Sequence, residues 1–165
     1  KICLRRRRMR LKKRHKRRIK VRKVVVPPPE VNVYYQRPGS GTYAYLSNTL
    51  PQHVESDIAF RGKNTFSGSI ALSPAGTEIQ LQEAGSYLVA FMIRAADMNR
   101  IGFVFNQEVI SEAVFVSEPN GFNAGQYVLT IQGSGTLKVV NVTGHPVQLR
   151  DEQAVNASVF IQKLA

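Results

Sequence analysis

From Thr42 onward the sequence is a series of short strand-like segments, and this pattern limits the folds that the chain can adopt. In segments such as Ile101/Phe103/Phe105, apolar residues recur at every second position, which is the period of a strand with one buried face. Gly, Pro, Asn and Ser separate the segments, and no stretch keeps a helical period. Many short strands without helices predict an all-β fold, either a β-sandwich or a jelly roll.

The expected strands follow one another at a spacing of about ten residues, as is typical of small sandwiches. They cover residues 42–46, 57–60, 65–72, 78–82, 86–94, 101–106, 109–116, 127–132, 136–142, 147–150 and 157–164. Residues 105–109 and 132–136 have the composition of turns, and we expect a hairpin at each.

Charge divides the chain into two unlike parts. Fifteen of its 23 Lys and Arg residues lie in residues 1–23, which contain no Asp or Glu. The remaining 142 residues carry 8 basic and 11 acidic side chains, a net charge of −3. A segment with this charge density cannot bury enough apolar surface to fold alone. The sequence therefore predicts an extended basic arm followed by a separate domain.

Three regions follow from this division. Residues 1–26 are the polycationic arm, residues 27–41 a Pro- and Gly-rich linker with a short strand, and residues 42–165 the jelly-roll domain. Pro27–Pro29 must be extended and cannot donate backbone hydrogen bonds. The cations expected to dock or bind anions are Arg5, Arg6, Arg7, Arg8, Arg10, Lys12, Lys13, Arg14, Arg17 and Arg18. The residues expected to form a connector strand are Val24, Val25, Val26, Val31 and Val33.

Several expected strands are apolar on both faces. Residues 87–93 (YLVAFMI) are the longest example, and residues 114–116 and 159–161 are similar. Such a strand must be covered twice, once by its own core and once by another surface. In a single sandwich the second cover is most simply another subunit, so we expect self-association.

Residues 83–93 (EAGSYLVAFMI) resemble the Gly-x-Tyr strand of the tumour necrosis factor and complement q-subcomponent superfamily, with Gly85 and Tyr87 at the matching positions. The C-terminal residues 156–165 (NASVFIQKLA) resemble the last strand of the same fold. Within this superfamily, residues 57–165 are most similar to the C-terminal domain of BclA-type collagen-like proteins of the bacterial spore exosporium.

The resemblance implies a ten-strand jelly roll, a tight homotrimer, and a structural or adhesive role on a surface. It assigns the fold signature and the trimer core to Gly85, Tyr87, Val89, Phe91, Ile93, Val159 and Ile161. The chain has no Gly-X-Y stalk, which needs glycine at every third position. The arm stands in its place, and this favours a subunit whose arm docks into a neighbour or a coat layer.

We expect no enzymatic activity, cofactor or metal. His15, His53 and His145 lack acidic or Cys neighbours at metal-ligand spacing, and no nucleophile elbow is present. The one cysteine, Cys3, excludes an internal disulfide framework and leaves an intermolecular disulfide or an idle thiol. No apolar run is long enough for a membrane span. The charged start is not followed by the apolar stretch of a Sec signal.

Three functions remain open at this stage. The first is a structural protein of a bacterial spore surface, exosporium or appendage, in which jelly-roll trimers join into a fibre or layer, or bind other coat proteins, through the arm. The second is a small viral capsid protein whose Arg-rich arm binds nucleic acid. The third is a receptor- or glycan-binding head. The motifs at residues 85–87 and 156–165 favour the first.

Overall fold

The structure is a computed structural model that describes residues 41–150 and 154–164, and these residues form strands, turns and loops. Their strands are β1 (Tyr43–Asn48), β2 (Gln52–Val54), β3 (Thr65–Ser67), β4 (Ile70–Leu72), β5 (Ile79–Leu81), β6 (Gly85–Arg94), β7 (Asn99–Phe105), β8 (Glu108–Ser117), β9 (Phe122–Ile131), β10 (Gly135–Asn141), β11 (Val147–Leu149) and β12 (Ala157–Lys163). Within the described part of the chain there is no helix that could cross a membrane.

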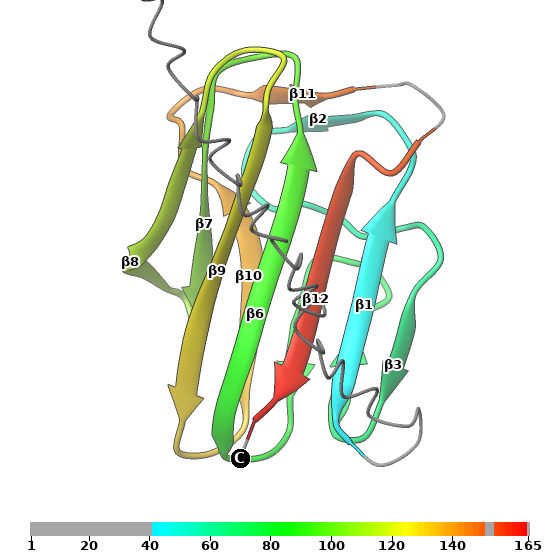
Figure 1. Ribbon diagram of the computed structural model, residues 1–165, viewed down its shortest axis with the longest axis vertical. Coiled ribbons are helices and arrows are strands. Elements are labelled where there is room, and N and C mark those ends of the chain that lie inside the picture. Colours follow the sequence, from blue (N-terminus) through cyan, green and yellow to red (C-terminus); the bar gives the residue numbers. More distant parts are fainter. Residues whose placement is uncertain (1–40, 151–153, 165) are drawn as a thin grey trace, which may run out of the picture. The chain divides into compact units, whose positions relative to one another are not determined.

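Two antiparallel five-stranded sheets lie face to face (Figure 1). The first sheet has the strand order β3-β1-β12-β6-β9, and the second has the order β4-β5-β10-β7-β8. A short pair, β2 and β11, crosses one end of the sandwich. Several neighbours in the sheets are distant in sequence, as in β1 with β12 and β5 with β10. The expected all-β sandwich is confirmed.

The core lies between the two sheets and follows from strand alternation. In β6, every second side chain from Tyr87 to Ile93 is buried, whereas the residues between them are partly or fully exposed. The inward residues of both sheets form one apolar cluster. At its centre, the Phe91 ring lies edge-on to Phe103 at a centroid distance of 5.4 Å and to Phe115 at 5.3 Å. This is a favoured geometry for aromatic pairs.

Gly125 leaves room for this aromatic cluster. It pairs with Phe91 across β9 and β6. A Cβ at this position would lie 2.5 Å from ring carbons of Phe115. Only glycine therefore fits at this point of β9 while the Phe115 ring keeps its place.

Two predicted strands are wrong in detail. Residues 65–72 form two strands, β3 and β4, which belong to different sheets. The break is at Gly68, where a φ of 73° turns the chain from one sheet to the other. Residues 57–60 form no strand, because they reach the second sheet only through an isolated bridge between Asp57 and Val140.

One predicted hairpin is confirmed and the other is wrong. Asn106 and Gln107 both have positive φ, 47° and 74°, and join β7 to β8 as an adjacent antiparallel pair. This is the backbone expected of a tight two-residue hairpin. Residues 132–136 instead carry the chain from β9 in the first sheet to β10 in the second. The sequence pattern also missed β2, which is only three residues long.

Candidate functional site

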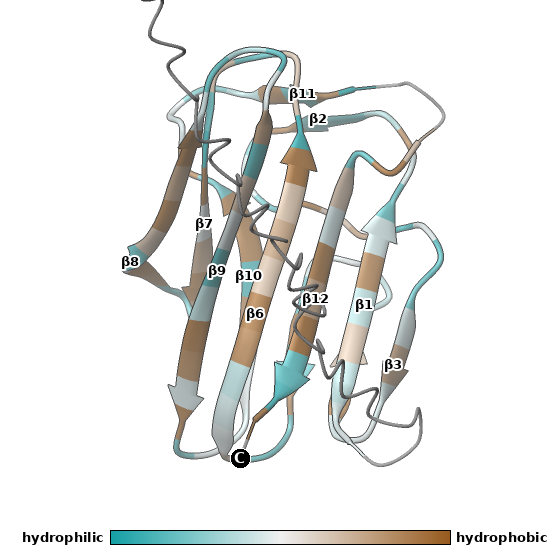
Figure 2. Cartoon of the chain, viewed as in Figure 1, coloured by the Kyte–Doolittle hydropathy of each residue, from teal (hydrophilic) through white to brown (hydrophobic). Residues whose placement is uncertain are grey.

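The side of the first sheet that faces away from the core carries a group of apolar side chains, which we call the outward face. It consists of Tyr45 on β1, Phe160 on β12, Leu88, Ala90 and Met92 on β6, and Phe122 and Val128 on β9. Figure 2 shows apolar residues along β6 and β12, the two neighbouring strands in the interior of this sheet.

Strand register brings these side chains together although they are distant in sequence. Tyr45 is opposite Phe160, Phe160 is opposite Ala90, and Ala90 is opposite Gln126. These four residues form one row across four strands. Adjacent strands lie about 4.8 Å apart, so the row is roughly 14 Å long. Gln126 of β9 is the polar residue at one end of this row.

Two further rows flank the first. Met92 is opposite Ser158 on one side and Ala124 on the other, and Leu88 is opposite Gln162 and Val128 in the same way. Phe122 lies at the end of β9, where the guanidinium of Arg94 sits 5.3 Å from its ring centroid. The face therefore has an apolar centre with amide, hydroxyl and guanidinium groups around it.

The large side chains on this face are only partly covered within one chain. The exposed fractions are 42% for Tyr45, 37% for Phe160, 38% for Met92, 50% for Val128 and 59% for Phe122. Single exposed apolar residues are common on proteins, but a contiguous group across four strands indicates an interaction surface.

The residues that the sequence assigned to the trimer core lie on the opposite side of the same strands. Tyr87, Val89, Phe91, Ile93, Val159 and Ile161 are all buried between the two sheets, each no more than 4% exposed. They are core residues of the subunit itself. The alternate positions, such as Leu88 and Phe160, are the ones left for a second surface to cover.

Gly85 and Tyr87 form the start of β6. Gly85 has a φ of 145°, a conformation that L side chains rarely adopt. The Tyr87 ring is fully buried, and its hydroxyl group donates a 2.8 Å hydrogen bond to the backbone carbonyl of Glu83. β6 lies between β12 and β9. Gly85 and Tyr87 therefore lie at the entry to an interior strand of the first sheet.

The arm and the connector residues lie outside the described residues. This applies to Arg5 through Arg18 and to Val24, Val25, Val26, Val31 and Val33.

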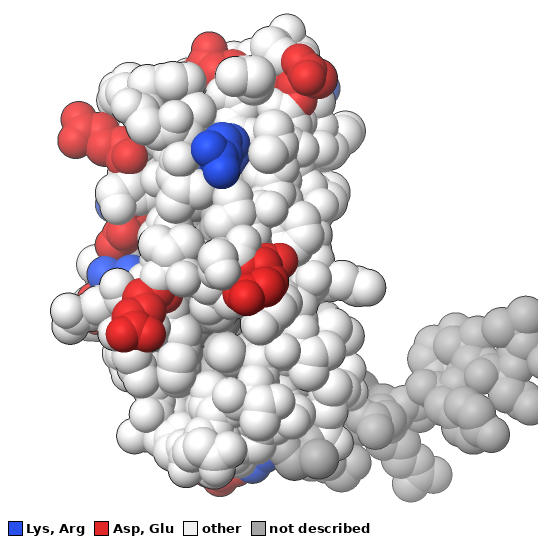
Figure 3. Space-filling model, turned by 90° about the vertical axis from the view of Figure 1, so that its left-hand side faces the viewer, with Lys and Arg blue, Asp and Glu red and all other residues white. Residues whose placement is uncertain are grey.

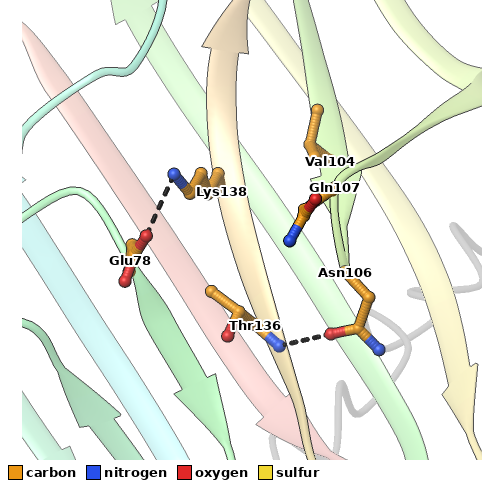
Figure 4. A pocket seen from close by; sticks show the side chains of 6 residues that line it. All are labelled: Glu78, Val104, Asn106, Gln107, Thr136 and Lys138. Carbon is orange, nitrogen blue, oxygen red and sulfur yellow. Dashed lines mark hydrogen bonds and ion pairs between the residues drawn. The ribbon is translucent and has the colours of Figure 1, made fainter.

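A second candidate lies on the outer side of the second sheet, where Lys138 of β10 lies beside a pocket of about 460 Å³ (Figure 4). The Lys138 Nζ is 3.0 Å from a carboxylate oxygen of Asp57 and 3.0 Å from one of Glu78. At the other end of the pocket, the side chain of Asn106 accepts a 2.9 Å hydrogen bond from the backbone N–H of Thr136.

This arrangement suits an ion-pair network better than a reactive centre. Hydrogen bonds from Lys138 to Asp57 and to Glu78 raise the pKa of Lys138 above its ordinary value of 10.5. The amine therefore stays protonated at neutral pH and is not a nucleophile. Its role is to tie the irregular segment around Asp57 to β10. Among the described residues, no three His, Cys, Asp or Glu side chains are grouped to hold a metal ion.

A similar exposed pair lies where β6 begins and β12 ends. Lys163 Nζ is 2.7 Å from a carboxylate oxygen of Glu83. The hydrogen bond from Lys163 lowers the pKa of Glu83, with a smaller contribution from Ser69. This pair fastens the end of the last strand beside the entry to β6.

No protein-family model matches the chain, and no curated protein matches its sequence. Solved structures do match its fold. The globular domain of zebrafish complement 1qA protein has a TM-score of 0.57 and 10% identity, over 76% of this chain and 97% of that one. Murine APRIL has a TM-score of 0.56 and 9% identity, over 74% and 98%. Eiger TNF from S. frugiperda has a TM-score of 0.53 and 16% identity, over 75% and 92%. The chain therefore has the jelly-roll fold of the tumour necrosis factor and complement 1q domains.

Proposed function

We propose that this chain is a non-enzymatic structural protein that assembles as jelly-roll homotrimers through the outward face. The observation that carries the proposal is the apolar row of Tyr45, Phe160 and Ala90, which the chain's own fold leaves partly exposed. Obligate interfaces are apolar at their centre and polar at their rim. The outward face has this composition.

We further propose that these trimers belong to a bacterial spore surface, exosporium or spore-associated fibre. The support is the sequence of residues 85–87 and 156–165, which resembles BclA-type domains. In this proposal the basic arm, residues 1–26, joins each trimer to the next one or to another coat protein.

A charge on the outward face tests the trimer. Phe160→Glu places a carboxylate in the middle of the apolar row, beside Tyr45 and Ala90. We expect folded monomers by sedimentation velocity, with a β-sheet circular dichroism spectrum like that of the wild type. The matched control is Met98→Glu, since Met98 is 47% exposed in the loop before β7. Trimers of Phe160→Glu as stable as those of Met98→Glu would contradict the proposal.

The charge of the arm favours one alternative, a small capsid protein that packages nucleic acid. Fifteen cations in residues 1–23 would neutralise phosphates, and such binding weakens steeply with salt, by about −0.9 in log–log slope per contact. For the structural protein we expect the purified particle to lack stoichiometric nucleic acid and to survive 0.5 M salt. A 260/280 nm absorbance ratio typical of packaged nucleic acid, with salt-labile assembly, would favour the capsid instead.

A further inference from the structure

The pocket beside Lys138 has no part in the proposed assembly. It lies on the outer side of the second sheet, whereas the outward face belongs to the first sheet, on the other side of the core. Its volume of about 460 Å³ falls within the range of about 300–1,000 Å³ that is usual for sites of small molecules. Its lining comes from three places: Glu78 precedes β5, Thr136 and Lys138 lie on β10, and Val104, Asn106 and Gln107 lie at the β7–β8 hairpin.

One wall of the pocket is the turn of Asn106 and Gln107, which is held against β10. The backbone N–H of Asn106 donates a 2.9 Å hydrogen bond to the carbonyl of Thr136, and the N–H of Thr136 donates one of 2.9 Å to the Asn106 side chain. Glycine at position 135 allows this close approach, because a Cβ there would lie 2.8 Å from Oδ1 of Asn106. The turn therefore presents the Gln107 side chain from a fixed backbone.

Gln107 is an unusual residue for this turn. Its φ of 74° is left-handed, and two-residue hairpins with this backbone strongly prefer Asn-Gly. Asn106 fits that preference, but glutamine in place of glycine stores conformational strain. Strain of this kind clusters at functional positions. Figure 4 shows the Gln107 side chain directed across the pocket toward β10, and this side chain forms no hydrogen bond with another described residue.

The opposite wall supplies both donors and acceptors. The Lys138 ammonium group has three protons. Asp57 and Glu78 each place a carboxylate oxygen 3.0 Å from it, which leaves one proton for a ligand. The Glu78 carboxylate and the Thr136 hydroxyl group keep lone pairs that can accept further hydrogen bonds. Val104 adds an apolar side chain to the lining.

The charge of the pocket disfavours an ionic ligand. Lys138 contributes one positive charge and its partners Asp57 and Glu78 two negative ones, a net charge of −1, so an anion gains little here. Residues 101–137 contain three Glu residues but no Lys or Arg. On the side of the domain that Figure 3 shows, acidic side chains outnumber basic ones. A cationic ligand would lie beside the protonated amine of Lys138.

We propose that this pocket binds a neutral pyranose ring of a glycan. Such a ring carries adjacent hydroxyl groups, each of which donates and accepts, and its C–H groups form an apolar patch. The hydroxyl groups accept from Lys138, donate to Glu78, and do both with the amide of Gln107. The C–H patch packs on Val104. This inference goes beyond the proposed function, because each subunit holds a complete site whether or not it assembles.

Saturation-transfer difference NMR of the full-length chain tests the site with defined probes. The neutral probes are the methyl glycosides of glucose, galactose, mannose and N-acetylglucosamine, and methyl glucuronide is the anionic comparison. At least one neutral glycoside should bind with a Kd of the order of 1 mM, as expected for a ligand of roughly 13 non-hydrogen atoms. Methyl glucuronide should give no signal at the same concentration.

Gln107→Gly separates the side chain from the turn. It removes the amide and gives the backbone the residue that it prefers, so the melting midpoint should be no lower than that of the wild type. Binding of the neutral glycoside should weaken about fivefold, the effect of one lost hydrogen bond. The matched control is Gln82→Gly, the same change at an exposed glutamine that does not line the pocket, and its affinity should equal that of the wild type.

Four results would overturn the proposal. They are the absence of binding by all four neutral glycosides, equal binding of methyl glucuronide, an unchanged affinity in Gln107→Gly, and an equal loss of affinity in Gln82→Gly.

Discussion

Replacing Phe91 by alanine should remove the centre of the sandwich core. The side chain is 4% exposed and is held between the two sheets by Phe103 and Phe115. Truncation of a buried Phe to Ala costs about 3–5 kcal/mol, because transfer energy is lost and a cavity remains. Each lost aromatic pair adds roughly 0.5–1.5 kcal/mol beyond the buried area. We therefore expect the upper half of that range, a large share of the roughly 5–15 kcal/mol of a typical domain.

Urea unfolding followed by circular dichroism measures this loss. All variants must be compared at one chain concentration, because the stability of an oligomer depends on concentration. The control is Phe66→Ala, since Phe66 of β3 is 50% exposed, and a change at an exposed site should cost less than about 1 kcal/mol. Phe91→Leu should lie between the two. Equal losses for Phe91→Ala and Phe66→Ala would refute the position of Phe91 in the core.

Three further predictions concern single contacts. Gly125→Val should destabilise the domain by about 1–3 kcal/mol in urea unfolding, because the new side chain meets the Phe115 ring; no loss would contradict the close approach. Tyr87→Phe should cost about 1 kcal/mol in the same assay, because the carbonyl of Glu83 loses its donor; an unchanged midpoint would count against that bond. The pKa of Lys138 is raised in the folded chain above its ordinary value of 10.5, so its ion pairs stabilise the domain below about pH 10.5. This stabilisation is lost as the pH rises through the pKa of the folded state. Lys138→Met should remove this alkaline loss of stability from thermal melts.

The sequence predicted the sandwich well because alternation is a local property. Tyr87, Val89, Phe91 and Ile93 stand at every second position of one strand, and all four are buried. The sequence could not tell where a chain changes sheets. Residues 65–72 read as one strand and residues 132–136 as a hairpin turn. Both segments in fact carry the chain from one sheet to the other, and that choice depends on packing elsewhere in the chain.

The outward face was harder to predict than the core. Apolarity on both sides of residues 87–93 indicated that a second cover was needed, yet the pattern alone does not say which side faces the core. The structure identifies Leu88, Ala90 and Met92 as the outward set. Tyr45 joins them only through the register of β1 with β12, which links residues far apart in sequence.

A pocket between β8 and β9 could not be predicted from the sequence either, because its lining comes from both sheets. Glu108 and Glu112 lie in β8, whereas Tyr127 and Leu129 lie in β9 of the opposite sheet.

Sedimentation equilibrium of the Phe160→Glu variant and the wild type, at several micromolar concentrations and at 0.15 and 0.5 M salt, tests the central claim most directly. The outward face is apolar at its centre, so salt should not weaken the contact. The wild-type data should contain a particle of three chains as the smallest populated species at both salt concentrations, and the variant should be a monomer. A wild-type monomer at micromolar concentration, or a trimer that is unchanged by Phe160→Glu, would contradict assembly through the outward face.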